Sequence, residues 1–238
     1  MSLRNIIRKL IFKEKCDSQT YVKHLRKLGM RIGERVEIYA PRSNVIDVTR
    51  PWLIEIGDDV KITHGVTILT HGYDWSVLAG LRDEVLGSAG KVKIGNNVFI
   101  GMHSTILKGV SIGNNVIIGA NSLVNKDIPD NVVVAGNPAR VIMSVDEYYA
   151  KRKAEQKKEA LELYKNYVEV YGQAPKKEVF DEFFWLFEDG KDALPESFKR
   201  QMSHHGRFEE NLQNLKAVTP EFSGYNEFLV WLESESSK

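Results

Sequence analysis

The chain has 238 residues, and its 33 lysines and arginines nearly balance its 32 aspartates and glutamates. Its one cysteine, Cys16, excludes an internal disulfide and favours a reducing compartment. No apolar run approaches the roughly 18 to 20 residues that cross a bilayer, and the first residues lack the apolar core and cleavage site of a secretory signal. No long basic run is interleaved with aromatic residues, as nucleic-acid binding would favour. These features predict a cytoplasmic globular protein that does not bind nucleic acid.

Residues 1–30 have apolar residues at helical spacing, with Asp17 or Ser18 as the candidate N-cap and Gly29 as a stop signal. They predict an N-terminal helical cap on the domain that follows, because the open end of a repeat fold must be covered. The first residues, LRNIIRKLIFKEK, are also basic and amphipathic. Weak contact with an anionic membrane surface is therefore an alternative role for this segment.

From residue 31 to residue 143, aliphatic residues recur every six positions. Residues 94–129 divide into IGNNVF, IGMHST, ILKGVS, IGNNVI, IGANSL and VNKDIP, and residues 56–73 divide into IGDDVK, ITHGVT and ILTHGY. This period fits neither a helix nor a two-faced strand, but it fits a coil with three flat faces, which closes one turn in about 18 residues. The aliphatic residues then point inward, and the glycines that often follow them allow tight corners. The repeat predicts a mainly β fold, a parallel β-helix.

The six-residue register breaks between Ile68 and Ile94, which are not a multiple of six apart. A loop must therefore leave the coil at about residues 71–91, and loops that leave a rigid scaffold often carry function. After the coil, residues 144–238 begin with a long charged helical segment, and the stretch FFWLF at 183–187 fits a helical core. This region predicts an α-helical C-terminal extension.

The repeats, the loop that begins THGYDW and the stretch VSIGNNVIIGANSLVNKDIPDNVVVAGNPARVI resemble the hexapeptide-repeat acyltransferases. Within that family the sequence is most similar to the maltose, galactoside and capsular-polysaccharide O-acetyltransferases, from Ile56 to about Ile142. The resemblance implies a left-handed coil, a homotrimer with active sites between subunits, and acetyl-CoA as the donor. It also implies O-acetylation of a sugar hydroxyl, such as that of a surface-polysaccharide precursor.

Acetyl transfer to a hydroxyl requires a base that takes the hydroxyl proton, and histidine is suited to this task near neutral pH. His71 opens the loop and occupies the position that matches the family's catalytic histidine. Asp74 is a candidate to orient the imidazole or to bind a sugar hydroxyl. Four further residues are candidates for contact with the acceptor, two as aromatic platforms and two by their place in the sequence: Tyr73, Trp75, Asn44 and Asp47.

The resemblance places acetyl-CoA against the last coils. Eight residues match the family's donor site: Gly101, Gly119, Ala120, Asn125, Lys126, Asn137, Pro138 and Arg140. Gly101 and Gly119 match corners where the pantetheine chain approaches the backbone, and Lys126 and Arg140 match positions near the phosphates, which cations bind well. No metal is expected.

Three alternatives remain at this stage. N-acetylation of an amino sugar or another small acceptor would use the same residues. A coil that serves only for assembly would need neither His71 nor the sequence GNPAR at 136–140. An enzyme like the γ-carbonic anhydrases would hold zinc on three histidines between subunits, including a His-x4-His pair that this sequence lacks.

Overall fold

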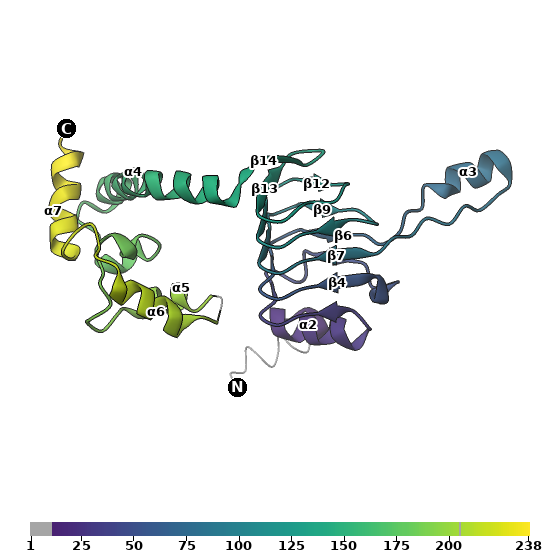
Figure 1. Cartoon of the computed structure of the whole chain (residues 1–238), viewed down its shortest axis with the longest axis horizontal. Helices are drawn as coiled ribbons and strands as arrows, with labels where there is room; N and C mark the ends of the chain where they lie inside the picture. Colours follow the sequence, from purple (N-terminus) through teal and green to yellow (C-terminus); the bar gives the residue numbers. More distant parts are fainter. Residues whose placement is uncertain (1–10, 205) are drawn as a thin grey trace. The chain divides into compact units, whose positions relative to one another are not determined.

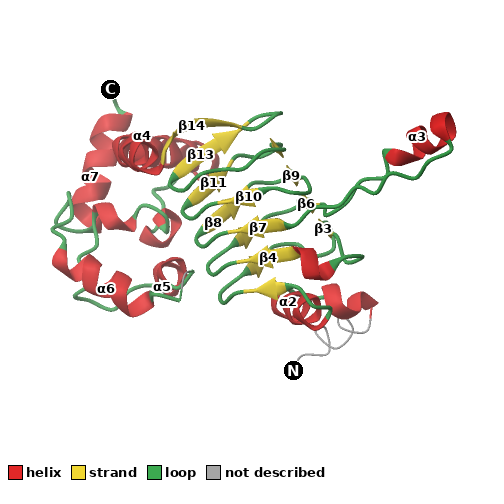
Figure 2. Ribbon diagram, turned by 45° about the vertical axis from the view of Figure 1, so that its right-hand side comes forward, coloured by secondary structure: helices red, strands yellow, loops and turns green. Residues whose placement is uncertain are grey.

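The computed structural model describes residues 11–204 and 206–238, and contacts divide the chain into two units, Met1–Tyr148 and Tyr149–Lys238. The first unit is mainly parallel β-sheet and the second is helical (Figures 1 and 2). The mainly β fold with a helical C-terminal region is thereby confirmed. The division between the units lies close to the predicted one at 143/144.

The first unit winds through three sheets in turn. Sheet A contains β1 (Arg31–Ile32), β4 (Ile54–Ile56), β7 (Val92–Ile94) and β10 (Ser111–Ile112). Sheet B contains β2 (Glu37–Ile38), β5 (Lys61–Ile62), β8 (Val98–Ile100), β11 (Val116–Ile118), β13 (Val132–Ala135) and the antiparallel β14 (Arg140–Ser144). Sheet C contains β3 (Val45–Ile46), β6 (Thr67–Ile68), β9 (Thr105–Ile106) and β12 (Leu123–Val124).

Along the chain, the strands visit sheets A, B and C in order and then return to sheet A, each strand pairing in parallel with the one a coil earlier. This is the three-sided parallel β-helix that the six-residue period predicts, and its left-handed winding stays an expectation from the resemblance. We name its corners the A–B, B–C and C–A edges, in the direction of the chain. Every coil therefore presents one residue segment at each edge, stacked on those of its neighbours.

The aliphatic residue of each repeat points into the coil and is buried. Ile62, Ile100 and Ile118 stand on consecutive coils as register partners in sheet B, and none is accessible to solvent. Burying each such side chain contributes roughly 1.5 to 3 kcal/mol. The interior is a continuous apolar column, so each coil stabilises the next.

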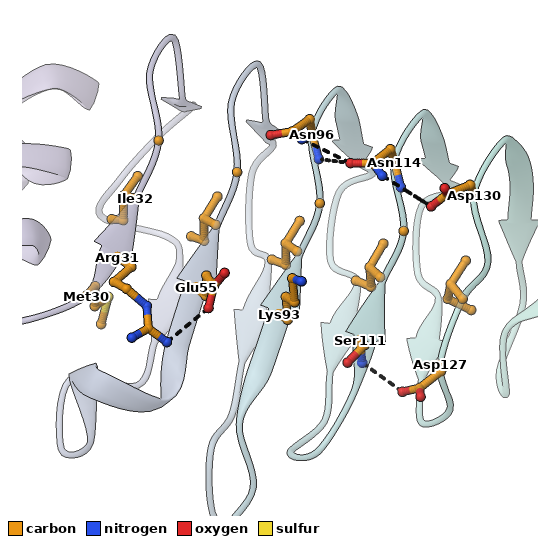
Figure 3. A pocket seen from close by; sticks show the side chains of 18 of the residues that line it. Met30, Arg31, Ile32, Glu55, Lys93, Asn96, Ser111, Asn114, Asp127 and Asp130 are labelled. Atoms are coloured by element: carbon orange, nitrogen blue, oxygen red, sulfur yellow. Dashed lines mark hydrogen bonds and ion pairs between the residues drawn. The ribbon is translucent and has the colours of Figure 1, made fainter.

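The A–B edge shows how closely successive coils approach. Asn96 donates its backbone N–H to Oδ1 of Asn114 at 2.9 Å, and Asn114 donates in the same way to Asp130 at 2.6 Å (Figure 3). A Cβ on Gly95 would lie 2.5 Å from the carbonyl oxygen of Gly113 in the next coil. Glycine is needed here because no side chain fits between the two backbones.

Helix α2 (Ser18–Lys27) precedes the coil, after the short 3₁₀ turn η1 (Lys13–Lys15). Asp17 caps it by accepting the Thr20 N–H at 2.8 Å, as one of the two predicted caps. Its buried Tyr21 and Leu25 belong to the same apolar cluster as the coil interior. The capping function of residues 1–30 stays a prediction. The proposed membrane contact falls largely on residues 1–10, outside the described residues.

The predicted excursion is present, and we call residues 71–91 the arm. An antiparallel bridge between His71 and Ala89 closes its base, where Gly90 donates its N–H to the Thr70 carbonyl at 2.9 Å. Its tip holds helix α3 (Trp75–Arg82), drawn far from the coil in Figure 1. The sequence predicted a loop without this helix, because eight residues are too few to show a helical period.

The second unit has a core of its own. Its elements are α4 (Val145–Tyr171), η3 (Lys177–Phe180), η4 (Phe184–Leu186), α5 (Glu196–Met202), α6 (Phe208–Ala217) and α7 (Tyr225–Ser236). The rings of Phe184 and Phe198 stack at 4.7 Å between centroids, and both are buried. The stretch 183–187 is thus core, as expected. No helix in the described part of the chain is long and apolar enough to cross a membrane.

We expect Gly95→Ala to destabilise the first unit by about 1 to 3 kcal/mol, because the added methyl would displace the next coil. Gly80→Ala is the matched control. A Cβ on Gly80 meets nothing within 4 Å, and Ala in a helix is favoured over Gly by about 1 kcal/mol. Urea unfolding followed by circular dichroism measures both variants. A Gly95→Ala midpoint at or above that of the wild type would contradict the close packing of the coils.

Candidate active site

His71 lies at the root of the arm, on the C–A edge, and it contacts a carboxylate. Its Nδ1 is 2.6 Å from Oδ2 of Asp47, and the two side chains are 12% and 4% exposed. The carboxylate accepts a hydrogen bond from Nδ1–H, so the ring keeps its proton on Nδ1 and its lone pair on Nε2. Nε2 makes no hydrogen bond with any described residue. It is therefore free to act as a base.

Asp47 is held in place by donors on two coils. Oδ1 accepts the N–H and the Oγ1–H of Thr49 at 2.9 and 2.7 Å, and Oδ2 accepts the N–H and the Oγ1–H of Thr70. Burial raises the pKa of the Asp47 carboxyl, but the hydrogen bonds from Thr49, Thr70 and His71 outweigh burial and hold this pKa well below its ordinary value. Asp47 is therefore an oriented anion at neutral pH.

The prediction that Asp74 orients the imidazole is wrong. Asp74 is exposed at the start of α3 and makes no hydrogen bond with His71 within the described residues. The partner is Asp47, which follows β3 just as His71 follows β6, and these two strands are neighbours in sheet C. Coil stacking therefore brings together two residues that are 24 positions apart.

The assignment of Asn44 to the acceptor is also wrong. Its side chain is buried, 1% exposed, and both ends are occupied. Nδ2 donates to the Tyr39 carbonyl at 2.9 Å, and Oδ1 accepts the Val66 N–H at 2.8 Å. Asn44 therefore ties two coils together, and its buried side chain is not accessible to a ligand. Asp47 was likewise predicted to contact the acceptor, but its hydrogen bonds make it the partner of His71.

Tyr73 and Trp75, the two predicted aromatic platforms, lie next to His71. The Tyr73 ring meets the imidazole edge-on, with centroids 4.9 Å apart, and the Trp75 ring follows at 6.1 Å from Tyr73. Tyr73 is 67% exposed, so one of its faces is open to a ligand. Both residues remain candidates for acceptor binding.

The eight predicted donor residues divide between two edges of the coil. Gly101, Gly119 and Ala120 follow β8 and β11, and Asn137, Pro138 and Arg140 form the turn into β14; these six lie at the B–C edge. The turn is fixed there because Ala139 donates its N–H to the Leu123 carbonyl at 2.8 Å. Asn125 and Lys126 follow β12 at the C–A edge, two coils beyond His71. One chain therefore does not bring the two sets together.

The backbone of the B–C edge offers an open donor next to Gly101. The N–H groups of Gly101 and Gly119 bond to the Ile118 and Val134 carbonyls at 2.8 Å, so they hold the coils together. The Ala120 N–H has no partner among residues 11–204 and 206–238, and the residue is exposed. A Cβ on Gly101 would lie 2.6 Å from this nitrogen. Glycine at 101 keeps the Ala120 N–H accessible to a carbonyl oxygen.

A separate groove follows sheet A on the first unit and contains none of these residues. Arg31 donates to Glu55 at 2.9 Å, and Ser111 donates its N–H to Asp127 at 2.8 Å (Figure 3). Glu55 also binds Lys91 at 2.6 Å. These polar groups are engaged with one another, and no histidine is found among the residues that line the groove. The candidate site residues therefore lie at the C–A and B–C edges and not in this groove.

Comparison with known proteins supports the repeat fold. The family model described as bacterial transferase hexapeptide, with six repeats, matches residues 91–126. Protein CapG of Staphylococcus aureus is 46% identical over 127 residues, which are 53% of this chain and 73% of CapG. The galactoside O-acetyltransferase of Escherichia coli (strain K12) is 42% identical over 110 residues, 44% of this chain and 53% of that protein. The chain thus spans about half of the second relative.

Among solved structures, a maltose O-acetyltransferase from Clostridium difficile 630 aligns with a TM-score of 0.44 and 30% identity, covering 59% of this chain and 84% of that one. The match to the repeat model includes every coil from β7 to β12. Identity of 46% extends over nearly three quarters of CapG. The chain therefore belongs to the family of hexapeptide-repeat acetyltransferases.

Proposed function

We propose that the protein transfers the acetyl group of acetyl-CoA to a sugar hydroxyl, with His71 as the general base. The observation that carries the proposal is the His71–Asp47 pair, which leaves the Nε2 lone pair of His71 free, on a ring that contacts the exposed Tyr73. The half-buried Trp75 lies beside Tyr73. A coil that served only for assembly would have no use for a buried, fully hydrogen-bonded carboxylate on a histidine. Acetyl-CoA supplies a thioester, whose carbonyl carbon is the electrophile.

Each residue has a distinct task in this reaction. Nε2 of His71 takes the proton of the acceptor hydroxyl as its oxygen attacks the thioester carbonyl, and Asp47 stabilises the imidazolium that forms. The Ala120 N–H is placed to donate to the carbonyl oxygen as it gains negative charge. The imidazolium then returns its proton to the sulfur that leaves. The carbon–sulfur bond breaks, the acetyl group is now bonded to the sugar oxygen, and free CoA is released.

A sugar is the acceptor that the surroundings of His71 suit best. Tyr73 and Trp75 offer aromatic faces, against which the apolar face of a pyranose can stack. The names of the relatives, a galactoside and a maltose O-acetyltransferase, point to the same class. We propose a surface-polysaccharide precursor as the physiological acceptor.

A homotrimer completes the site in this proposal. His71 and Lys126 lie on the C–A edge, whereas Ala120 and Arg140 lie on the B–C edge of the same prism. A donor that contacts all four needs the C–A edge of one copy to face the B–C edge of another. Because the two edges differ, the contact is heterologous and closes as a ring.

The base and its partner are tested together. We expect His71→Ala to lower kcat by about 10² to 10⁴ with CoA affinity unchanged. Asp47→Asn should also lower kcat strongly, because an amide can donate to Nδ1 and thereby favour the wrong tautomer. Asp74→Asn is the matched comparison and should keep at least ten times the kcat of Asp47→Asn, since Asp74 does not touch the imidazole. Equal kcat values for the two Asp variants would overturn the role of Asp47.

Shared sites are tested by mixing chains that are each impaired, assayed at a low concentration of acetyl-CoA. His71→Ala and Arg140→Glu affect opposite edges, so a mixed trimer contains some sites in which both edges are intact, and activity should return in part. His71→Ala mixed with Lys126→Glu is the control, because both changes fall on the C–A edge and no site can be whole. Light scattering should give about three times the 27.1 kDa of one chain. Restoration in both mixtures, or in neither, would contradict the shared site.

The donor phosphates are tested by charge reversal. Lys126→Glu with Arg140→Glu should raise the KM for acetyl-CoA at least tenfold, because each lost charge-assisted hydrogen bond costs about 1.5 to 3 kcal/mol. The acceptor KM should change little. Lys153→Glu with Lys165→Glu, which reverses two exposed lysines of α4, is the control of equal charge. Calorimetry with CoA measures both double variants, and equal affinities would remove Lys126 and Arg140 from the donor site.

A further inference from the structure

Arg50 is a cation that has no partner among the described residues, on the chain segment that carries Asp47. It lies in the segment 47–53, which joins β3 to β4 at the C–A edge and includes the 3₁₀ turn η2 (Pro51–Leu53). Its Nη1 atom is shut off from solvent and has no hydrogen-bond partner, and no ion pair joins Arg50 to any described residue. The same state is found for only one other side-chain atom in the described part of the chain, the neutral Oγ of Ser197.

The nearest carboxylate along the segment cannot serve Arg50. Asp47 already accepts five hydrogen bonds, two from Thr49, two from Thr70 and one from His71. A carboxylate offers about four lone-pair directions, so Asp47 has no capacity left for a guanidinium. A buried guanidinium nitrogen without an acceptor is destabilising. Arg50 therefore gains strongly from any anion that reaches it.

The rest of the segment suits a sugar. Trp52 is 62% exposed, and buried Pro51 fixes the backbone between it and Arg50. Arg50 as a whole is partly exposed, although its Nη1 atom is buried. Asp47, three residues before Arg50, touches the imidazole that takes the hydroxyl proton. A cation and an open aromatic ring thus stand on the same short segment as the partner of the base.

We propose that Arg50 binds an anionic group of the acceptor, so that the acceptor is an acidic or a phosphorylated sugar. This inference rests on the proposed function and specifies its substrate class. The guanidinium is planar and forms paired hydrogen bonds with a carboxylate or a phosphate alike. Arg50 would hold the acceptor by a group remote from the hydroxyl that reacts. Its contribution therefore appears in recognition and not in the proton transfer.

The test uses matched acceptors that differ only in charge. Glucose, glucuronate and glucose 1-phosphate, and the same three compounds of galactose, are compared as acceptors with the full-length protein and acetyl-CoA. We expect the wild type to favour an anionic member of a set by tenfold or more in kcat/KM, and Arg50→Gln to abolish that preference through acceptor KM. Glucuronate and galacturonate report a carboxylate, and the two sugar phosphates report a phosphate. Arg31→Gln is the matched control, because Arg31 is already paired with Glu55.

Three results would overturn the inference. The wild type could acetylate neutral and anionic sugars equally well, or Arg50→Gln could retain the preference for the anion. Light scattering could show that Arg50→Gln dissociates the assembly, in which case the partner of Arg50 is a carboxylate of a second copy. Calorimetry with the same sugars separates this inference from the reaction. Binding of an anionic sugar that Arg50→Gln abolishes, without acetyl transfer, would retain Arg50 as an anion site and refute the proposed function.

Discussion

The parallel hydrogen-bond ladders between successive coils are the constraint on which every feature of the first unit depends. They fix residues that are far apart in sequence directly above one another, as with Ile100 over Ile62 and Asn114 over Asn96. The ladders hold because an aliphatic residue fills the interior at every sixth position and a glycine permits the corners. Side chains at the edges are therefore placed by the backbone of the neighbouring coil as much as by their own.

The charge arrangement around His71 follows from this stacking. The segment after β3 supplies an anion, Asp47, and the segment after β6 supplies the imidazole that this anion orients. Two threonines, one from each segment, donate hydrogen bonds to the Asp47 carboxylate, so that its position does not depend on a single loop. Because Asp47 already orients the His71 imidazole, little reorganisation would be needed when this ring takes up a proton. Arg50 then stands out, because it is a cation in the same segment that has no partner among residues 11–204 and 206–238.

Much of the fold could be predicted from the sequence, because the aliphatic residues that recur every six positions are the ones that fill the interior. His71 could be located through its family resemblance, since it opens the break in the register. Its partner could not, because the coil from β3 to β6 has extra residues: Val45 pairs with Thr67, whereas Thr105 pairs with Leu123 in a regular coil. Counting 18 residues per coil therefore aligns Asp47 with Gly65 and not with His71. Asp74 was favoured by mere proximity in sequence. Helix α3 and the fold of residues 149–238 could not be predicted in the same way, because these segments lie outside the six-residue repeat.

Because successive coils are evenly spaced, the number of coils between two residues measures their distance along the β-helix axis. Neighbouring coils are separated by about 4.8 Å, the spacing of paired strands. Lys126 therefore lies about 10 Å along the axis from His71, since two coils separate them. The number of coils between His71 and Lys126 sets the length of a molecule that can contact both residues. Inserting or removing one coil would change that length in a single increment, while the chemistry at either end stayed the same.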